Sequence, residues 1–148
     1  MNFELISMKV LIKKLIPDVK LPSYAHPGDV GLDLYSREQY TLRVGERRIF
    51  NLGFALEFNS GYAAMVKDKS SLPKNAGLHT MGGVYDAGYR GEYNVQLINL
   101  GSEAYTIETG DKIAQLVIFP VALAELTETA ELSEARRGTG QFGSTGRK

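Results

Sequence analysis

Residues 82–95, "GGVYDAGYRGEYNV", place a carboxylate in a tight turn between tyrosines. The sequence Asp86-Ala87-Gly88 predicts the turn of a hairpin, in which the glycine supplies the positive φ that a three-residue loop needs. Backbone groups at the mouth of such a hairpin could bind the edge of a flat ligand. The alternative is structural: Asp86 only forms the turn, and Tyr89 only packs in the core.

Residues 25–36, "AHPGDVGLDLYS", place glycines and two aspartates around a turn that enters a strand. Turn formation alone would explain this composition. The functional interpretation makes Asp33 a carboxylate on the magnesium side of a site, because Mg²⁺ prefers oxygen ligands and keeps several waters.

Residues 67–75, "KDKSSLPKN", gather three lysines and two serines at a predicted helical turn after Lys69. Ser70 or Ser71 can cap this turn, and Pro73 suits its first residues. Helix amides and hydroxyls together make a good seat for a phosphate group. A solvated basic loop is the alternative.

Residues 110–119, "GDKIAQLVIF", form a predicted strand in which Gln115 interrupts an apolar run. A buried amide without a hydrogen bond costs about 1–3 kcal/mol. Gln115 therefore has either a structural partner or a ligand, and the sequence does not decide between them.

The chain ends in "RGTGQFGSTGRK", residues 137–148. Such a glycine-rich end is usually a frayed tail. Here, however, Arg137 can bind a phosphate through two hydrogen bonds, Phe142 can stack on a base, and the backbone can close around phosphate oxygens. The five segments together describe one ligand, a flat base with a phosphate chain.

The composition is typical of a soluble globular domain, with 148 residues, 43% of them hydrophobic and 23% charged. A net charge of zero gives no overall attraction to nucleic acid or membrane. The absence of cysteine excludes disulfides and thiolate metal sites, and two histidines are too few for a multi-histidine zinc site. The N-terminus has no apolar run of signal-peptide or membrane-span length, so we expect a cytoplasmic protein.

Short apolar runs and period-two patterns, separated by Gly, Pro, Asn and Asp, predict an all-β sandwich or barrel. The expected strands cover 9–14, 31–35, 40–44, 47–58, 62–67, 93–99, 104–107 and 112–119. We expect a single domain, with a core over about 1–126 and a polar arm over about 127–148.

The five segments, in their order along the chain, resemble the five motifs of the trimeric dUTP pyrophosphatases over about residues 25–146. The resemblance implies a distorted β-barrel or jelly-roll subunit in a homotrimer with shared active sites, each closed by the flexible Gly-rich C-terminal arm of another subunit. It also implies Mg²⁺-assisted attack of water on the α-phosphorus of dUTP. The products, dUMP and pyrophosphate, would limit uracil in DNA and supply dUMP for thymidylate synthesis.

The resemblance further implies a role for each site residue. Asp86 would orient and deprotonate the water, Asp33 would face Mg²⁺ through its water shell, and Tyr89 would pack under the deoxyribose. The backbone over 83–89, including Gly83 and Val84, would bind uracil beneath Phe142 and Gly143. The residues expected to hold the phosphates are Lys69, Ser70, Ser71, Gln115, Arg137, Ser144 and Thr145.

Two positions depart from the family pattern. Lys69 stands where arginine is common, and a lysine offers a point charge in place of a planar fork. Gln141 stands where a second glycine is usual, so closure of the tail can differ there.

Three other functions compete with this one. In the related dCTP deaminases, the proton-shuttling glutamate aligns with Gln96, which cannot exchange a proton near neutral pH. A dUTPase-like binding or regulatory protein is a second alternative, although Asp86, Gln115 and Phe142 are all present. A nucleic-acid-binding module is the third, and the zero net charge disfavours it.

Overall fold

The structure is a computed structural model that describes residues 8–135 and 138–140. The strands are β1 (Leu11–Lys14), β2 (Gly31–Tyr35), β3 (Tyr40–Leu42), β4 (Arg47–Asn51), β5 (Phe54–Glu57), β6 (Tyr62–Lys67), β7 (Leu78–Thr80), β8 (Val84–Asp86), β9 (Asn94–Asn99), β10 (Tyr105–Ile107) and β11 (Lys112–Pro120). One short helix, α1 (Ser71–Ala76), lies between β6 and β7. The all-β prediction is therefore confirmed. No helix in the described residues has the length and apolarity needed to cross a membrane.

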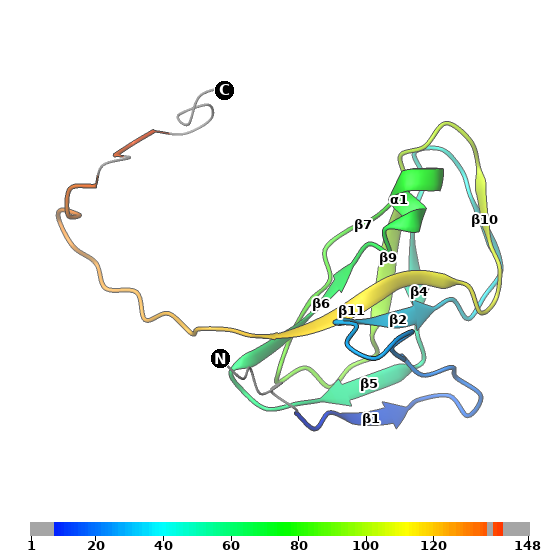
Figure 1. Cartoon of the computed structure of the whole chain (residues 1–148), viewed down its shortest axis with the longest axis horizontal. Coiled ribbons are helices and arrows are strands. Elements are labelled where there is room, and N and C mark those ends of the chain that lie inside the picture. Colours follow the sequence, from blue (N-terminus) through cyan, green and yellow to red (C-terminus); the bar gives the residue numbers. More distant parts are fainter. Residues whose placement is uncertain (1–7, 136–137, 141–148) are drawn as a thin grey trace.

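The strands pair antiparallel in four sheets, with no single closed barrel among the described residues. The largest sheet has the order β2-β11-β6-β8, and a second has the order β4-β9-β7. Two smaller sheets pair β1 with β5 and β10 with β3. Figure 1 shows β11 running through the body beside β2 and β6.

Both larger sheets contribute to one hydrophobic core. Leu34 and Leu116 from the four-stranded sheet are fully buried in the same cluster as Phe50 and Leu97 from the three-stranded sheet. Burying such a side chain stabilises the fold by about 1.5–3 kcal/mol relative to exposing it. The core thus fixes β2 and β11, which carry Asp33 and Gln115, and β6, which lies between β11 and β8.

Most predicted strands lie where expected, with bounds that differ by at most two residues, but the long strand over 47–58 is wrong. It divides into β4 and β5, which belong to different sheets. Gly53 separates them with φ of 75°, its amide donates to Glu92 Oε1 at 2.8 Å, and its carbonyl accepts from the Leu15 amide. Apolar residues on both sides concealed this turn, because Phe50 and Leu52 before Gly53 and Phe54 and Leu56 after it are all buried. β7 and β8 are not among the predicted strands.

The helical turn expected after Lys69 is present as α1. Ser70 occupies the N-cap position, but its side chain makes no capping hydrogen bond, so the expected hydroxyl cap is not found. The helix ends at Gly77, which has φ of 68° and whose amide donates to the carbonyls of Leu72 and Pro73.

After β11, the Val121 amide donates to the Gly61 carbonyl at 2.9 Å, and the chain then leaves the body. Figure 1 shows this extended segment leading away from β11. Leu123, Leu126 and Leu132 are 86%, 93% and 88% exposed, respectively. The division into a core and an arm near residue 126 remains a prediction.

Alanine substitutions at Gly77 and Gly45 test whether the close approach of Gly101 requires a glycine at the end of α1. Gly45 is the control, because it shares the positive φ but has no close neighbour. Both have positive φ, at 68° and 76°, but a Cβ on Gly77 would lie 2.6 Å from Gly101 Cα, whereas a Cβ on Gly45 would meet nothing within 4 Å. The left-handed conformation should cost each alanine variant about 1–2 kcal/mol. Gly77→Ala should lose about 1–3 kcal/mol more because of the overlap. Urea unfolding measures both, and equal losses would contradict the close approach.

Candidate active site

Three neighbouring strands bring the first group of predicted site residues together. On β11, Gln115 pairs with Asp33 of β2 on one side and with Lys67 of β6 on the other. The loop that follows β6 carries Lys69 and Ser70, so this register places that loop beside Asp33.

Asp33 is a buried carboxylate held between two ammonium groups. Only 3% of the residue is exposed, and Lys69 Nζ lies 2.8 Å from Oδ1 while Lys112 Nζ lies 2.6 Å from Oδ2. Burial raises the pKa of the Asp33 carboxyl, but Lys112 and Lys69 lower it by more, so the pKa lies below its ordinary value. Asp33 is thus an ionised group whose Oδ1 accepts a hydrogen bond from Lys69, while its Oδ2 contacts Lys112 as an ion pair and has no hydrogen-bond partner in the described residues.

This arrangement does not fit the metal-facing role expected of Asp33. A hydrated Mg²⁺ needs an accessible acceptor oxygen, whereas both oxygens of this carboxylate face cations that would repel it. Within residues 8–135 and 138–140, no group of three or more His, Asp or Glu side chains could hold a metal ion. The donor set around Asp33 is suited to an anion beside the lysines.

Gln115 has the structural partner that the sequence left open. Its Nε2 donates to the Asp68 backbone carbonyl at 2.8 Å. Gly31 makes room for this side chain, because a Cβ at that position would overlap Gln115 Oε1. The amide therefore fixes the loop between β6 and α1 to strand β11.

Asp68 fixes the same loop from the other side and was missed by the sequence analysis. Its Oδ1 accepts the Thr80 amide at 2.6 Å, and its Oδ2 lies 2.7 Å from His79 Nδ1. Burial raises the pKa of Asp68, whereas the hydrogen bonds from Thr80 and His79 lower it by more. The sequence did contain a signal for this role: Asp68 lies between Lys67 and Lys69. A negative charge there would weaken phosphate binding, so its presence suggests a structural role.

The two predicted serines lie at the accessible start of α1. Ser70 is exposed and its hydroxyl does not cap the helix. Ser71 lines a cavity of about 370 Å³ together with Lys69 and Lys112. This cavity brings lysines from two segments to one place.

The second group of site residues lies on β8, which is an edge strand of its sheet. The predicted turn is present, because the Tyr89 amide donates to the Asp86 carbonyl at 3.0 Å. The predicted hairpin pairing is not found, since β8 pairs with β6, and Gly88 is not among the glycines with positive φ. Gly83 has positive φ, at 96°, and its missing side chain leaves room for Val66.

The register of β8 decides which backbone groups reach its outer edge. The Gly83 carbonyl accepts the Val66 amide at 2.8 Å, so this residue faces β6. Because backbone groups in an antiparallel ladder alternate in direction, those of Val84 and Asp86 point away from β6. Within β8, the backbone groups at the outer edge are therefore those of Val84 and the amide of Asp86, since the Asp86 carbonyl accepts the Tyr89 amide.

Tyr89 forms part of a cluster of three tyrosine rings. Its centroid lies 5.4 Å from that of Tyr85 and 5.9 Å from that of Tyr93. Its hydroxyl donates to the Glu92 carbonyl at 3.0 Å, and a side chain on Gly91 would overlap that hydroxyl. The ring is held in place, yet Tyr89 remains 40% exposed.

The two groups of site residues lie at opposite ends of β6. Asp86 pairs with Ala63 near the start of that strand, whereas Gln115 pairs with Lys67 at its end. Four residues of extended strand separate these positions by about 13 Å. The remaining predicted residues, Arg137, Phe142, Gly143, Ser144 and Thr145, lie outside the described part of the chain.

The family model described as dUTPase matches residues 18–146. The chain is 45% identical over 143 residues to the deoxyuridine 5'-triphosphate nucleotidohydrolase of Thermobifida fusca, covering 95% of this chain and 80% of that protein. The chain belongs to the dUTPase family.

Two solved dUTPases of staphylococcal phages have similar folds. The enzyme of Staphylococcus bacteriophage 80alpha, solved with dUPNHPP, has a TM-score of 0.88 at 26% identity, covering 93% of this chain and 98% of its own. The enzyme of phage phi11 of S. aureus, solved as a variant with a structural Mg(II) ion, has a TM-score of 0.77 at 24% identity, covering 83% and 97%. The jelly-roll fold expected from the motifs is confirmed.

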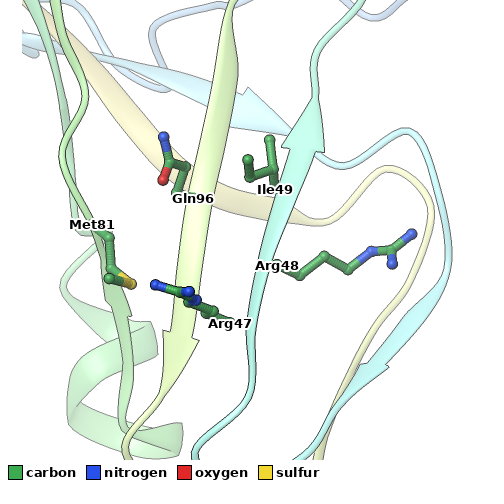
Figure 2. Close-up of a pocket in the computed structure, with 5 residues that line it drawn as sticks. All are labelled: Arg47, Arg48, Ile49, Met81 and Gln96. Atoms are coloured by element: carbon green, nitrogen blue, oxygen red, sulfur yellow. The ribbon is translucent and has the colours of Figure 1, made fainter.

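Gln96, where the related deaminases would carry their glutamate, lies outside both groups of dUTPase site residues. It lines a surface pocket of about 290 Å³ on the β4-β9-β7 sheet, shown in Figure 2 with Arg47, Arg48, Ile49 and Met81. None of these five side chains belongs to the predicted site. The pocket therefore does not support the deaminase alternative.

The anchoring role of Asp68 can be measured through the loop that it holds. Asp68→Ala leaves the Thr80 amide without its acceptor, so the free energy of unfolding should fall by about 1–3 kcal/mol. Asp68→Asn keeps an oxygen for that amide and should lose less than half as much. Chemical denaturation compares the two variants. If both lose the same stability, the hydrogen bond to Thr80 is not what anchors the loop.

Proposed function

We propose that this chain hydrolyses dUTP to dUMP and pyrophosphate, as a dUTP diphosphatase. The supporting observation is the paired construction of the site: a lysine and serine cluster suited to phosphates at one end of β6, and an exposed carboxylate beside a free strand edge at the other. The match to dUTPase over residues 18–146 includes both.

The proposed oligomer is a homotrimer with shared active sites. One dUTP molecule must present the same α-phosphate to the phosphate cluster and to Asp86, but the backbone positions on β6 that pair with Gln115 and Asp86 lie about 13 Å apart within one chain. A site assembled from the two ends of β6 on different subunits removes this separation. The C-terminal arm would then cover the nucleotide from a neighbouring subunit.

Asp86 is the proposed catalytic residue. Its exposed carboxylate would accept a proton from water while the water oxygen forms a bond to the α-phosphorus and the bond to the bridging oxygen breaks. Pyrophosphate leaves with that oxygen, and dUMP retains the α-phosphate. Positioning contributes much of the rate, because the water is held at the reacting atom.

We propose that the outer edge of β8 binds the uracil base. The outward backbone groups of Val84 and the outward amide of Asp86 would pair with the polar edge of the base. A site built to pair with one base leaves its groups unpaired against another, and such mismatches can cost up to about 10⁴-fold. Tyr89 would pack under the sugar, where a ribose 2'-hydroxyl would have no room.

Magnesium dependence is part of the proposal, supported by the family and by the Mg(II) ion of the phi11 enzyme. Because Asp33 does not fit as its acceptor, we propose no step through Asp33. A cytoplasmic location is also proposed, supported by a chain without cysteine that needs no oxidising compartment.

Replacing Asp86 tests the catalytic assignment. Asp86→Asn should bind the imido analogue dUpNHpp within about 3-fold of wild type but lose about 10²–10⁴-fold in kcat, because the amide cannot accept the proton. Asp18→Asn, which removes the same charge from an exposed turn, is the control. Initial rates of pyrophosphate release decide the matter, and near-normal turnover in Asp86→Asn would remove this residue from the mechanism.

Tyr89 tests the sugar contact. Tyr89→Ala should reduce the preference for dUTP over UTP in kcat/KM by at least about tenfold, because the ring that excludes the 2'-hydroxyl is gone. Tyr89→Phe keeps the ring, loses only the hydrogen bond to Glu92, and should retain the preference. An unchanged preference in Tyr89→Ala would show that another residue excludes ribose.

A further inference from the structure

We propose that Lys112 is a second phosphate-binding lysine, and that buried Asp33 is a positioning residue which holds Lys69 and Lys112 together as one anion site. This inference rests on the proposed function and assigns Asp33 a role other than facing the metal. It also explains how a chain with lysine at a position where the family commonly has arginine can still orient its cation.

The first step is the geometry of the pair. Lys69 comes from the loop after β6, and Lys112 is the first residue of β11. Their Nζ atoms lie 2.8 and 2.6 Å from different oxygens of the Asp33 carboxylate. One rigid buried group therefore fixes two flexible side chains that approach from separate segments.

The second step is the hydrogen-bonding capacity that remains. Each ammonium group has three N–H donors. Lys69 uses one of them in its hydrogen bond to Asp33 Oδ1, whereas Lys112 contacts Oδ2 only as an ion pair. The Lys69 and Lys112 side chains remain 31% and 41% exposed, whereas the Asp33 side chain is only 4% exposed. The accessible parts of the cluster are thus donors, and its acceptor is buried.

The third step is the space in front of the lysines. Both line the cavity of about 370 Å³ that also includes Ser71 and Gly110. Asp111 lines it too, with its Oδ2 accepting the Glu108 amide at 2.9 Å. The cavity therefore offers two ammonium groups and a serine to a phosphate group.

Tethering also compensates for the difference between lysine and arginine. A free lysine is a flexible point charge that loses side-chain entropy when it binds phosphate. Because Asp33 already restricts Lys69 and Lys112 before the nucleotide arrives, less of that entropy remains to be lost.

The experiment measures binding of dUpNHpp without metal, in EDTA, by calorimetry on the full-length protein. Hydrogen bonds from charged groups are among the stronger ones, so Lys112→Gln should raise Kd by about 10-fold or more. Lys112→Arg should stay within about 3-fold of wild type because it keeps the charge. Lys13→Gln, which removes an exposed lysine from β1, controls for the loss of overall charge and should bind as wild type does.

A second measurement separates positioning from a metal contact. In Asp33→Asn, the Mg²⁺ concentration for half-maximal dUTP hydrolysis should stay within about 2-fold of wild type, because the carboxylate does not face the metal. A rise of tenfold or more would overturn the assignment of Asp33. Should Asp33→Asn fail to fold, Lys112→Gln alone decides the proposal, and wild-type affinity for dUpNHpp in EDTA would refute it.

These measurements distinguish an error in the proposed lysine site from an error in the proposed dUTP hydrolysis. If wild type hydrolyses dUTP but Lys112→Gln binds dUpNHpp normally, only the lysine site is wrong. If wild type neither binds dUpNHpp nor releases pyrophosphate from dUTP, the proposed function itself is wrong.

Discussion

The ion pairs of buried Asp33 with Lys69 and Lys112 organise the phosphate end of this site. A buried charge is tolerated only when it is paired, and removing one partner leaves the other uncompensated. The core around Leu34 and Leu116 keeps β2 and β11 together, and this holds the carboxylate in place. The hydrophobic core thus positions the cluster of Asp33, Lys69 and Lys112, the ion pairs stabilise it, and we propose that its two lysines bind phosphate.

Strand β6 links this cluster to the proposed chemistry. Its final residue pairs with Gln115, and its second residue pairs with Asp86. A rigid strand cannot bring its two ends together, so we propose that a site that needs both draws them from different subunits. This constraint and the family support the proposed trimer.

The sequence predicted the family and the all-β fold better than it predicted the contacts between distant residues. The five motifs gave the family and the all-β fold, because glycines, turn residues and polar side chains at fixed positions are local features. The break at Gly53 was missed because apolar residues continue on both sides of it. The hydrogen bond from Thr80 to Asp68 and the ion pair of Lys112 with Asp33 were missed because they depend on which strands become neighbours. The metal-facing role of Asp33 did not fit for the same reason: its two lysines come from distant parts of the chain.

Subunit complementation tests the central claim, that each site combines opposite ends of β6 from different chains. Asp86→Asn and Gln115→Ala proteins would each be purified inactive, mixed in equal amounts, unfolded and refolded together. If sites are shared between subunits, random assembly should restore about a quarter of wild-type dUTP hydrolysis, because that fraction of sites receives both intact ends. If each chain holds a complete site, the mixture should be no more active than the two variants refolded separately, and this result would contradict the account.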